Sequence, residues 1–160
     1  ALAKMGVTPN ADLLRVMHAR ATATAADFNP QAVANLLWAH ACFGTPHNEA
    51  SGRMAESMAV QLLAVREELI VEDKSQLHQW LLFCDLDPKW RGELPRSMQL
   101  VKDELGGGFR QALERQTSRS SLLQVDVARH LRMSFPALKF EEEFVDAESG
   151  YSIDIRAQRR

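Results

Sequence analysis

The sequence contains few cysteines. Cys42 and Cys84 are the only two in 160 residues, too few for the disulfide framework of a small secreted domain. Each lies in an apolar run, residues 38–43 or 80–86, where a buried free thiol is the usual state. We therefore expect two buried thiols and a reducing compartment.

Long hydrophobic runs are also missing. No run of apolar residues approaches the roughly 20 needed to cross a bilayer, and the chain does not open with a secretory signal pattern. Membrane and secretory roles are therefore not expected. The chain begins at Ala1 rather than at methionine, so we expect a processed or excised part of a longer protein, which a targeting peptide can precede.

Charge of one sign is not in excess. Nineteen Lys and Arg residues stand against twenty-one Asp and Glu residues, a net charge of -2. Without an overall attraction to phosphate backbones, any contact with nucleic acid must be local. A hydrophobic fraction of 46% is enough for one sizeable core.

Motifs for catalysis and cofactor binding are absent. The five histidines form no pair at metal-ligand spacing on one helix. The glycines at 106–108 lack the lysine and hydroxyl that follow in a phosphate-binding loop, and we interpret them as a helix stop and bend. A catalytic triad assembled from distant residues stays open. We expect no enzyme activity, no cofactor and no metal.

A short repeat organises the first part of the chain. The pattern A-x-A-x-x-G occurs at residues 1–6 and again at 39–44, 38 residues later. Alanines permit close helix packing, and Gly6 and Gly44 suit the left-handed conformation that ends a helix. The pattern favours paired-helix repeats, and two unrelated helix ends are the alternative.

Apolar spacing and capping residues predict a mostly α chain. Asn29 and Pro30 mark a helix start, and Trp38 lies in so apolar a helix that we expect it in the core. Ser51 is a candidate N-cap, and Met54, Met58 and Leu62 form a core stripe. The expected helices cover residues 11–26, 30–43, 51–69, 76–84, 94–105, 109–116 and 121–132.

The C-terminal third changes to strand patterns. Residues 138–145 and 151–155 alternate apolar and polar side chains around a turn at 146–150. Two strands alone are marginal in water, so we expect Phe140, Phe144, Tyr151, Ile153 and Ile155 to dock on the 121–132 helix or on a partner. The predicted fold is a paired-helix, α-solenoid-like region at 1–117, followed by a short two-stranded β unit within 118–160.

Two stretches resemble known families. The run FNPQAVANLLWAHA at residues 28–41 resembles the signature of octatricopeptide repeats, helical repeats that bind organellar RNA. The 121–132 helix, FEEEF at 140–144 and GYSIDI at 150–155 are similar to the opening of a RAP domain. Residues 76–79 and 94–95 resemble the segment that precedes this domain in FAST-kinase-like mitochondrial proteins.

The RAP resemblance also bears on catalysis. It implies a restriction-nuclease-like α/β fold, in which Asp154 occupies the place of the first metal-binding aspartate. The acidic residue and lysine of the following strand are not in the sequence, which ends at Arg160, so an incomplete domain without nuclease activity is expected. Glu141, Glu143 and Asp154 are interpreted as a solvated acidic face rather than a cation site.

The expected function follows from these resemblances. It is an RNA-associated helical scaffold of organellar RNA metabolism, such as a component of a mitochondrial ribosome, with a mitochondrial location and a plastid as the alternative. Its partners would be RNA, including ribosomal RNA, and proteins of a larger assembly. Arginine binds phosphate and stacks on bases, so we place RNA contacts at Arg119, Arg129, Arg132, Arg156, Arg159 and Arg160.

A second class of function fits the same sequence. Helical solenoids often act as protein-binding adaptors without RNA contact, and the near-neutral charge agrees with that class. Salt separates the two, because binding through several arginines weakens steeply with ionic strength whereas binding in an apolar groove does not.

Overall fold

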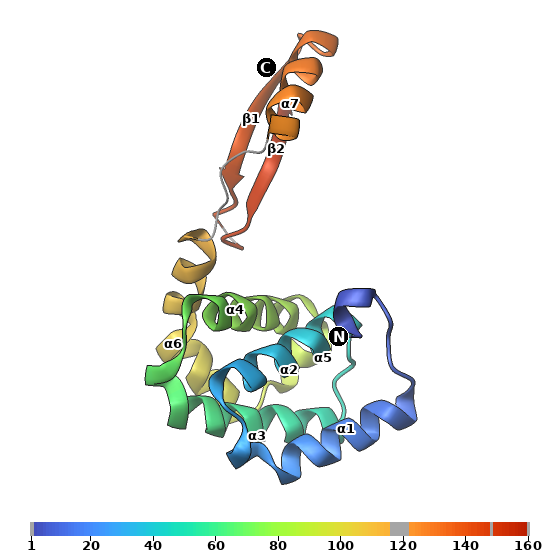
Figure 1. The fold of residues 1–160 in the computed structure, drawn as a ribbon, viewed down its shortest axis with the longest axis vertical. Coiled ribbons are helices and arrows are strands. Elements are labelled where there is room, and N and C mark those ends of the chain that lie inside the picture. Colours follow the sequence, from blue (N-terminus) through green and yellow to red (C-terminus); the bar gives the residue numbers. More distant parts are fainter. Residues whose placement is uncertain (1, 116–121, 148, 160) are drawn as a thin grey trace. The chain divides into compact units, whose positions relative to one another are not determined.

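The computed structural model describes residues 2–115, 122–147 and 149–159. Within them the chain is mostly helical, with seven α-helices followed by a two-stranded antiparallel hairpin (Figure 1). It divides into two compact units, Ala1–Phe109 and Arg110–Arg160, here called the helical unit and the C-terminal unit. The boundary expected at 117–118 falls among residues that are not described.

The helical unit begins with helices α1 (Ala11–Ala23), α2 (Pro30–Phe43), α3 (Glu49–Val65) and α4 (Val71–Leu86). Helix α1 packs on α3, and α2 packs on α4 (Figure 1). Asn10, Asn29 and Asn48 each cap a helix by accepting backbone N–H bonds. Gly44 ends α2 in the left-handed conformation, and Gly6 does the same for a 3₁₀ turn, Ala3–Met5. The expected helix ends at both glycines are confirmed.

Two further helices follow, and the second of them runs past Phe109 into the C-terminal unit. The short α5 (Pro88–Glu93) starts at the N-cap Asp87, and α6 covers Arg96–Arg115. The expected helix stop at residues 106–108 is wrong, because α6 continues through all three glycines. Its buried residues Met98, Val101, Phe109 and Ala112 recur on one face, and packing of this face offsets the roughly 1 kcal/mol that each helical glycine costs.

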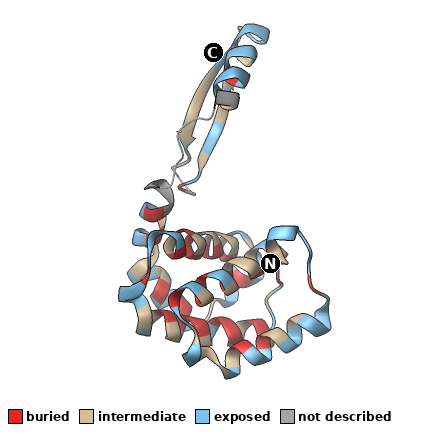
Figure 2. Ribbon diagram, in the orientation of Figure 1, coloured by how far each residue is buried: buried red, intermediate tan, exposed pale blue. Residues whose placement is uncertain are grey.

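The core of the helical unit lies among these helices (Figure 2). Its largest fully buried side chains include Trp80 of α4 and Trp90 of α5, whose rings meet edge to face with centroids 4.9 Å apart. The expected stripe is confirmed at Met54, Met58 and Leu62. Ser51 is not the N-cap of α3 but its third helical residue, paired with Asn48 in a capping box.

Two residues expected to be buried, Trp38 and Cys42, are not. Trp38 is only half-buried, and its indole N–H donates to Gln79 Oε1 at 2.6 Å. Cys42 is exposed, whereas Cys84 is buried. The buried face of α2 follows Val33, Leu37 and His40, and both corrected residues lie off that stripe. An almost continuous apolar run did not reveal which face turns outward.

The C-terminal unit contains α7 (Leu122–Ser134) and the hairpin of β1 (Leu138–Val145) and β2 (Ser152–Arg159). Phe144 pairs with Ile153, and Glu142 pairs with Ile155. Helix α7 contacts both strands, which agrees with the expected docking of the hairpin on this helix. Residue 121, where this helix is expected to begin, lies outside the described residues.

Candidate nucleic-acid interface

The arginines selected from sequence form local contacts. Arg129 pairs with Asp126 at 2.9 Å on α7, and Arg132 reaches Glu142 of β1 at 2.6 Å. The guanidinium carbon of Arg156 lies 3.8 Å from the centre of the Phe144 ring. Arg159 is exposed, and Arg119 and Arg160 lie outside the described residues. Arg132 therefore joins α7 to the hairpin, while Arg129 bonds within its own helix.

The Arg129–Asp126 ion pair is weak enough for a stronger anion to replace. The side chains of Arg129 and Asp126 are 65% and 59% exposed, and exposed pairs contribute only about 0–1 kcal/mol. The side chains of Arg132 and Glu142 are less exposed, so this ion pair contributes more to the stability of the C-terminal unit. Counted over the sequence, residues 110–160 hold nine basic and eight acidic side chains, and residues 1–109 hold ten and thirteen. The net positive charge is thus confined to the C-terminal unit.

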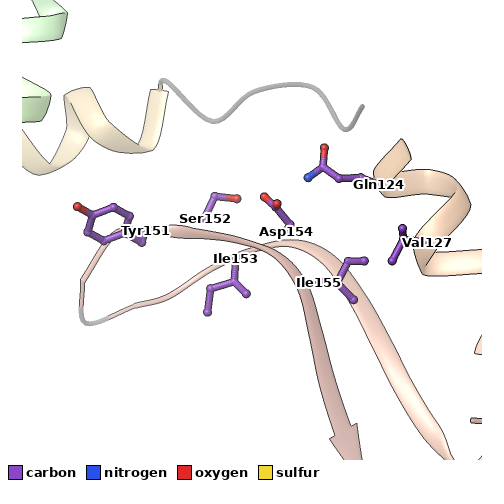
Figure 3. Close-up of a pocket in the computed structure, with 7 residues that line it drawn as sticks. All are labelled: Gln124, Val127, Tyr151, Ser152, Ile153, Asp154 and Ile155. Carbon is purple, nitrogen blue, oxygen red and sulfur yellow. The ribbon is translucent and has the colours of Figure 1, made fainter. Parts of the chain in front are cut away.

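A groove between α7 and β2 lies in the same unit (Figure 3). It is open, has a volume of about 750 Å³, and is here called the Tyr151 groove. Its lining residues are Gln124, Val127, Tyr151, Ser152, Ile153, Asp154 and Ile155. Tyr151 is 38% exposed, and Ser152 and Asp154 point to one side of β2 while Ile153 points to the other (Figure 3). The groove therefore combines an accessible aromatic ring with amide, hydroxyl and carboxylate groups.

Glu143 holds two groove residues from different elements. Its carboxylate accepts a hydrogen bond from the Ser152 hydroxyl at 3.0 Å and a longer one from the Gln124 amide at 3.4 Å. Glu143 also has a φ of +50° in the middle of β1, a conformation that costs a non-glycine residue of order 1 kcal/mol or more. Such strain persists only where surrounding contacts fix it, and these two bonds are such contacts. Glu143 is thus a structural organiser of the groove.

Sequence reasoning found part of this groove. It identified Tyr151, Ile153 and Ile155, but as an apolar docking face, whereas Tyr151 and Ile153 are both exposed by more than a third. Gln124 was missed, because only the packing of α7 on the hairpin brings it to β2. An isolated glutamine on a helix carries no signal of this in the sequence.

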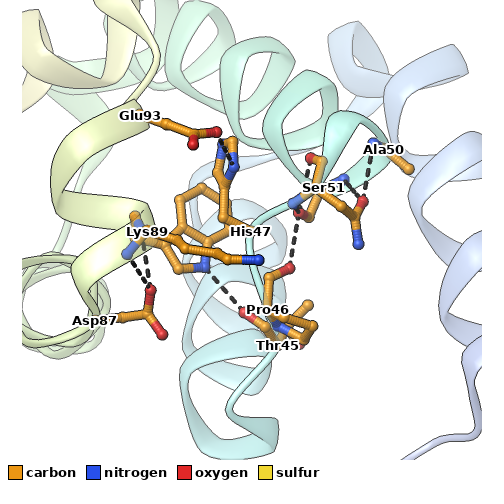
Figure 4. A network of polar contacts seen from close by, with 10 residues as sticks. Thr45, Pro46, His47, Ala50, Ser51, Asp87, Lys89 and Glu93 are labelled. Atoms are coloured by element: carbon orange, nitrogen blue, oxygen red, sulfur yellow. Dashed lines mark hydrogen bonds and ion pairs between the residues drawn. The ribbon is translucent and has the colours of Figure 1, made fainter.

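A second polar cluster has a structural role (Figure 4). The Trp90 indole N–H donates to the Thr45 carbonyl at 2.9 Å, and His47 Nδ1 lies 2.9 Å from Glu93 Oε2. The His47 ring meets the Trp90 ring edge to face, with centroids 4.6 Å apart. These contacts fix the α2–α3 connection against α5, while the buried Thr45 hydroxyl makes no hydrogen bond.

Two buried histidines form a third polar feature. His18 Nε2 and His40 Nε2 lie 2.9 Å apart, and His40 Nδ1 lies 2.7 Å from the Leu36 carbonyl. Because a carbonyl only accepts, His40 donates from Nδ1 and accepts at Nε2, so His18 donates from Nε2. Burial lowers the pKa of His40 to about 4 and also lowers the pKa of His18. Both rings are therefore neutral at pH 7.

The described part of the chain shows neither a cluster of metal ligands nor a membrane-spanning helix. No group of three or more His, Cys, Asp or Glu side chains there is arranged to hold a metal ion. None of the helices in the described ranges combines the length and the hydropathy of a membrane span. Comparisons with protein-family models, with curated proteins and with solved structures found no match to this chain.

Proposed function

We propose that this chain is a non-catalytic, RNA-associated helical scaffold of organellar RNA metabolism. The observation that carries the proposal is the Tyr151 groove, in which an accessible ring lies beside three kinds of hydrogen-bonding side chain. Single-stranded RNA is recognised by stacking of bases on aromatic rings and by hydrogen bonds to base edges. Tyr151 supplies the first kind of contact, and Gln124 and Asp154 supply the second.

The size and chemistry of the groove fit an unpaired base. Its volume of about 750 Å³ lies within the range of small-molecule sites. The Asp154 carboxylate accepts from base amino groups, and a glutamine amide both donates and accepts. Val127 and Ile155 provide apolar walls. In this proposal a base stacks on Tyr151, and the polar side chains of the groove bond to base edges.

The surrounding arginines supply phosphate contacts in this proposal. Arg156 follows the groove residue Ile155 directly, and Arg129 is two residues after Val127 on α7. Side chains at these spacings face different sides of a strand or helix, so the arginines would bind phosphates that flank the base rather than line the groove. An RNA phosphate bonds a guanidinium bidentately, which is stronger than the exposed Arg129–Asp126 pair it would replace. Arg119, Arg132, Arg159 and Arg160 remain candidates for the same role.

The helical unit serves as the scaffold. Helix α3 begins at Glu49, 38 residues after the start of α1 at Ala11, which equals the spacing of the A-x-A-x-x-G motif. The packing of α1 on α3 and of α2 on α4 is the layering expected of stacked helix pairs. These features support a paired-helix, solenoid-like repeat. In this proposal the C-terminal unit is the opening of a RAP-like domain, which rests on the sequence resemblance at residues 140–144 and 150–155. The resemblances favour a mitochondrial location, with a plastid as the alternative.

A protein-binding adaptor is the second candidate. Met133 and Phe135, at the end of α7 and just after it, are 75% and 52% exposed, and exposed apolar clusters mark protein interfaces. This surface lies outside the groove. The two candidates therefore separate by substitution as well as by salt.

Binding of a labelled single-stranded RNA, measured by fluorescence anisotropy, tests the proposal. We expect Tyr151→Ala to weaken binding by about tenfold, since stacking contributes about 1–3 kcal/mol per base. Phe135→Ala, which removes another exposed ring of the same unit, should leave affinity unchanged. Affinity should also fall as salt rises, with a slope of about -0.7 per phosphate contact. Equal affinity of Tyr151→Ala and the parent, or no salt dependence, would contradict the proposal and favour the adaptor.

A further inference from the structure

A separate groove lies in the helical unit, between α1 and α3. Its volume is about 510 Å³, and it is lined by Arg15, His18, Ala19, Thr22, Ala23, Ala50 and Arg53. The two arginines come from different helices and border the same hollow, and the lining contains no carboxylate. None of the interactions in the Tyr151 groove involves these residues, so this site is independent of the function proposed above.

The small side chains leave room for a ligand. Ala19, Ala23 and Ala50 line the same groove, where longer side chains would fill the space. Arg53 pairs with Glu49 at 2.8 Å, but these side chains are 66% and 82% exposed. An exposed pair one helical turn apart contributes only a few tenths of a kcal/mol. The Arg53 guanidinium is therefore available to a stronger anion.

His18 adds a buried polar group to the lining. It is 3% exposed. Its Nε2 donates to His40 Nε2, because His40 donates from Nδ1 to the Leu36 carbonyl. In the neutral ring Nδ1 is therefore the nitrogen that can take up a proton. The charged side chains of the same lining are Arg15 of its own helix and Arg53 of α3, and Arg53 is paired with the exposed Glu49. Both charges of the lining are positive and favour a negative ligand.

We propose that the α1–α3 groove binds a phosphate group, held by the guanidinium groups of Arg15 and Arg53 beside the Thr22 hydroxyl. Arginine matches phosphate oxygens in a bidentate geometry, and two arginines from separate helices can engage different oxygens of one group. The phosphate belongs either to a free small molecule or to a nucleic-acid backbone. The shared chemistry is the tetrahedral oxyanion.

Titration of the whole chain with inorganic phosphate at constant ionic strength tests this site, with the His18 ring resonances as the readout. We expect saturable shifts of His18, and at least a fivefold loss of affinity in both Arg15→Gln and Arg53→Gln. Arg20→Gln is the matched control, because Arg20 is an exposed arginine of α1 that lines a different hollow. It should keep the parent affinity. Far-UV circular dichroism checks that every variant is folded.

A dinucleotide with one phosphodiester, titrated in parallel, identifies the source of the phosphate. Tighter binding of the dinucleotide assigns the groove to a nucleic-acid backbone, and tighter binding of inorganic phosphate assigns it to a small phosphorylated molecule. The proposal is overturned if His18 does not shift with phosphate, or if Arg20→Gln weakens binding as much as Arg15→Gln does. Tyr151→Ala should not change these titrations, so failure of the RNA proposal and failure of this one are distinguishable.

Discussion

The helical unit and the C-terminal unit are stabilised differently. The helical unit buries Trp80, Trp90 and Phe109 almost completely, together with a cluster of leucines and methionines. In the C-terminal unit, the buried hydrophobic residues among the described side chains are Ala112 and Ala128. Apolar area removed from water is the main source of stability. We infer that the helical unit is folded by its own core, and that the hairpin owes its order to α7 and to what binds it.

The largest effect is expected in the core of the helical unit. Trp80→Ala should lower the free energy of unfolding by about 3–5 kcal/mol, the usual cost of removing a large buried aromatic side chain. Trp38→Ala is the matched control and should cost clearly less, because that ring is half-buried. Urea unfolding monitored by circular dichroism measures both. Equal losses in the two variants would show that the assignment of the core is wrong.

The next effect concerns α7. Ala128 is fully buried, so Ala128→Asp should place a carboxylate where it cannot be solvated, at a cost of several kcal/mol. We expect the hairpin to lose its order while the fluorescence of Trp38, Trp80 and Trp90, all in the helical unit, keeps the parent unfolding midpoint. Arg129→Ala, at the neighbouring exposed position, should keep both the order of the hairpin and the parent midpoint. A shift of the tryptophan midpoint in Ala128→Asp would show that the two units do not fold separately.

A third effect depends on pH. His40 has a pKa of about 4 in the folded chain against 6.5 in the unfolded chain, so the unfolded state binds a proton that the folded state excludes. Stability is therefore full above about pH 6.5 and falls as the pH drops toward 4, by roughly 3 kcal/mol. A double variant, His18→Leu with His40→Leu, should flatten this dependence. An unchanged pH profile in the double variant would exclude the histidine pair as its source.

The smallest effect distinguishes a continuous α6 from a broken one. Gly107→Ala and Gly108→Ala should each stabilise the chain by about 0.5–1 kcal/mol, because both positions are helical and a new Cβ meets nothing within 4 Å. Gly52→Ala should not stabilise, since its Cβ would lie 3.1 Å from His47 Nε2 and that ring is fixed by Trp90 and Glu93. Destabilisation by Gly107→Ala, measured by thermal unfolding, would indicate a non-helical glycine.

Local signals in the sequence predicted much of the fold. The bounds of α2 and of β1 match the expected ranges, because Asn29, Pro30 and Gly44 mark the ends of the helix and apolar residues at 138, 140 and 144 mark one face of the strand. Tertiary packing decided what local signals could not. It carried α6 through three glycines, and it turned Cys42 away from the core.

The candidate site was less predictable than the fold. The arginines were found from composition, but their carboxylate partners Asp126 and Glu142 were not. Glu142 and Arg132 are ten residues apart in sequence and meet only when α7 lies along the hairpin. The same packing creates the Tyr151 groove. A linear pattern does not contain the register of a helix on a strand, so the groove needed the structure.

Amide exchange of the whole chain with and without single-stranded RNA tests directly whether RNA binds at the Tyr151 groove. The account predicts that RNA slows exchange around Gln124–Val127 of α7 and along residues 151–156 of the hairpin, while residues 30–43 of the helical unit exchange at the same rate as before. No change along residues 151–156 at saturating RNA would contradict the assignment of RNA binding to the Tyr151 groove.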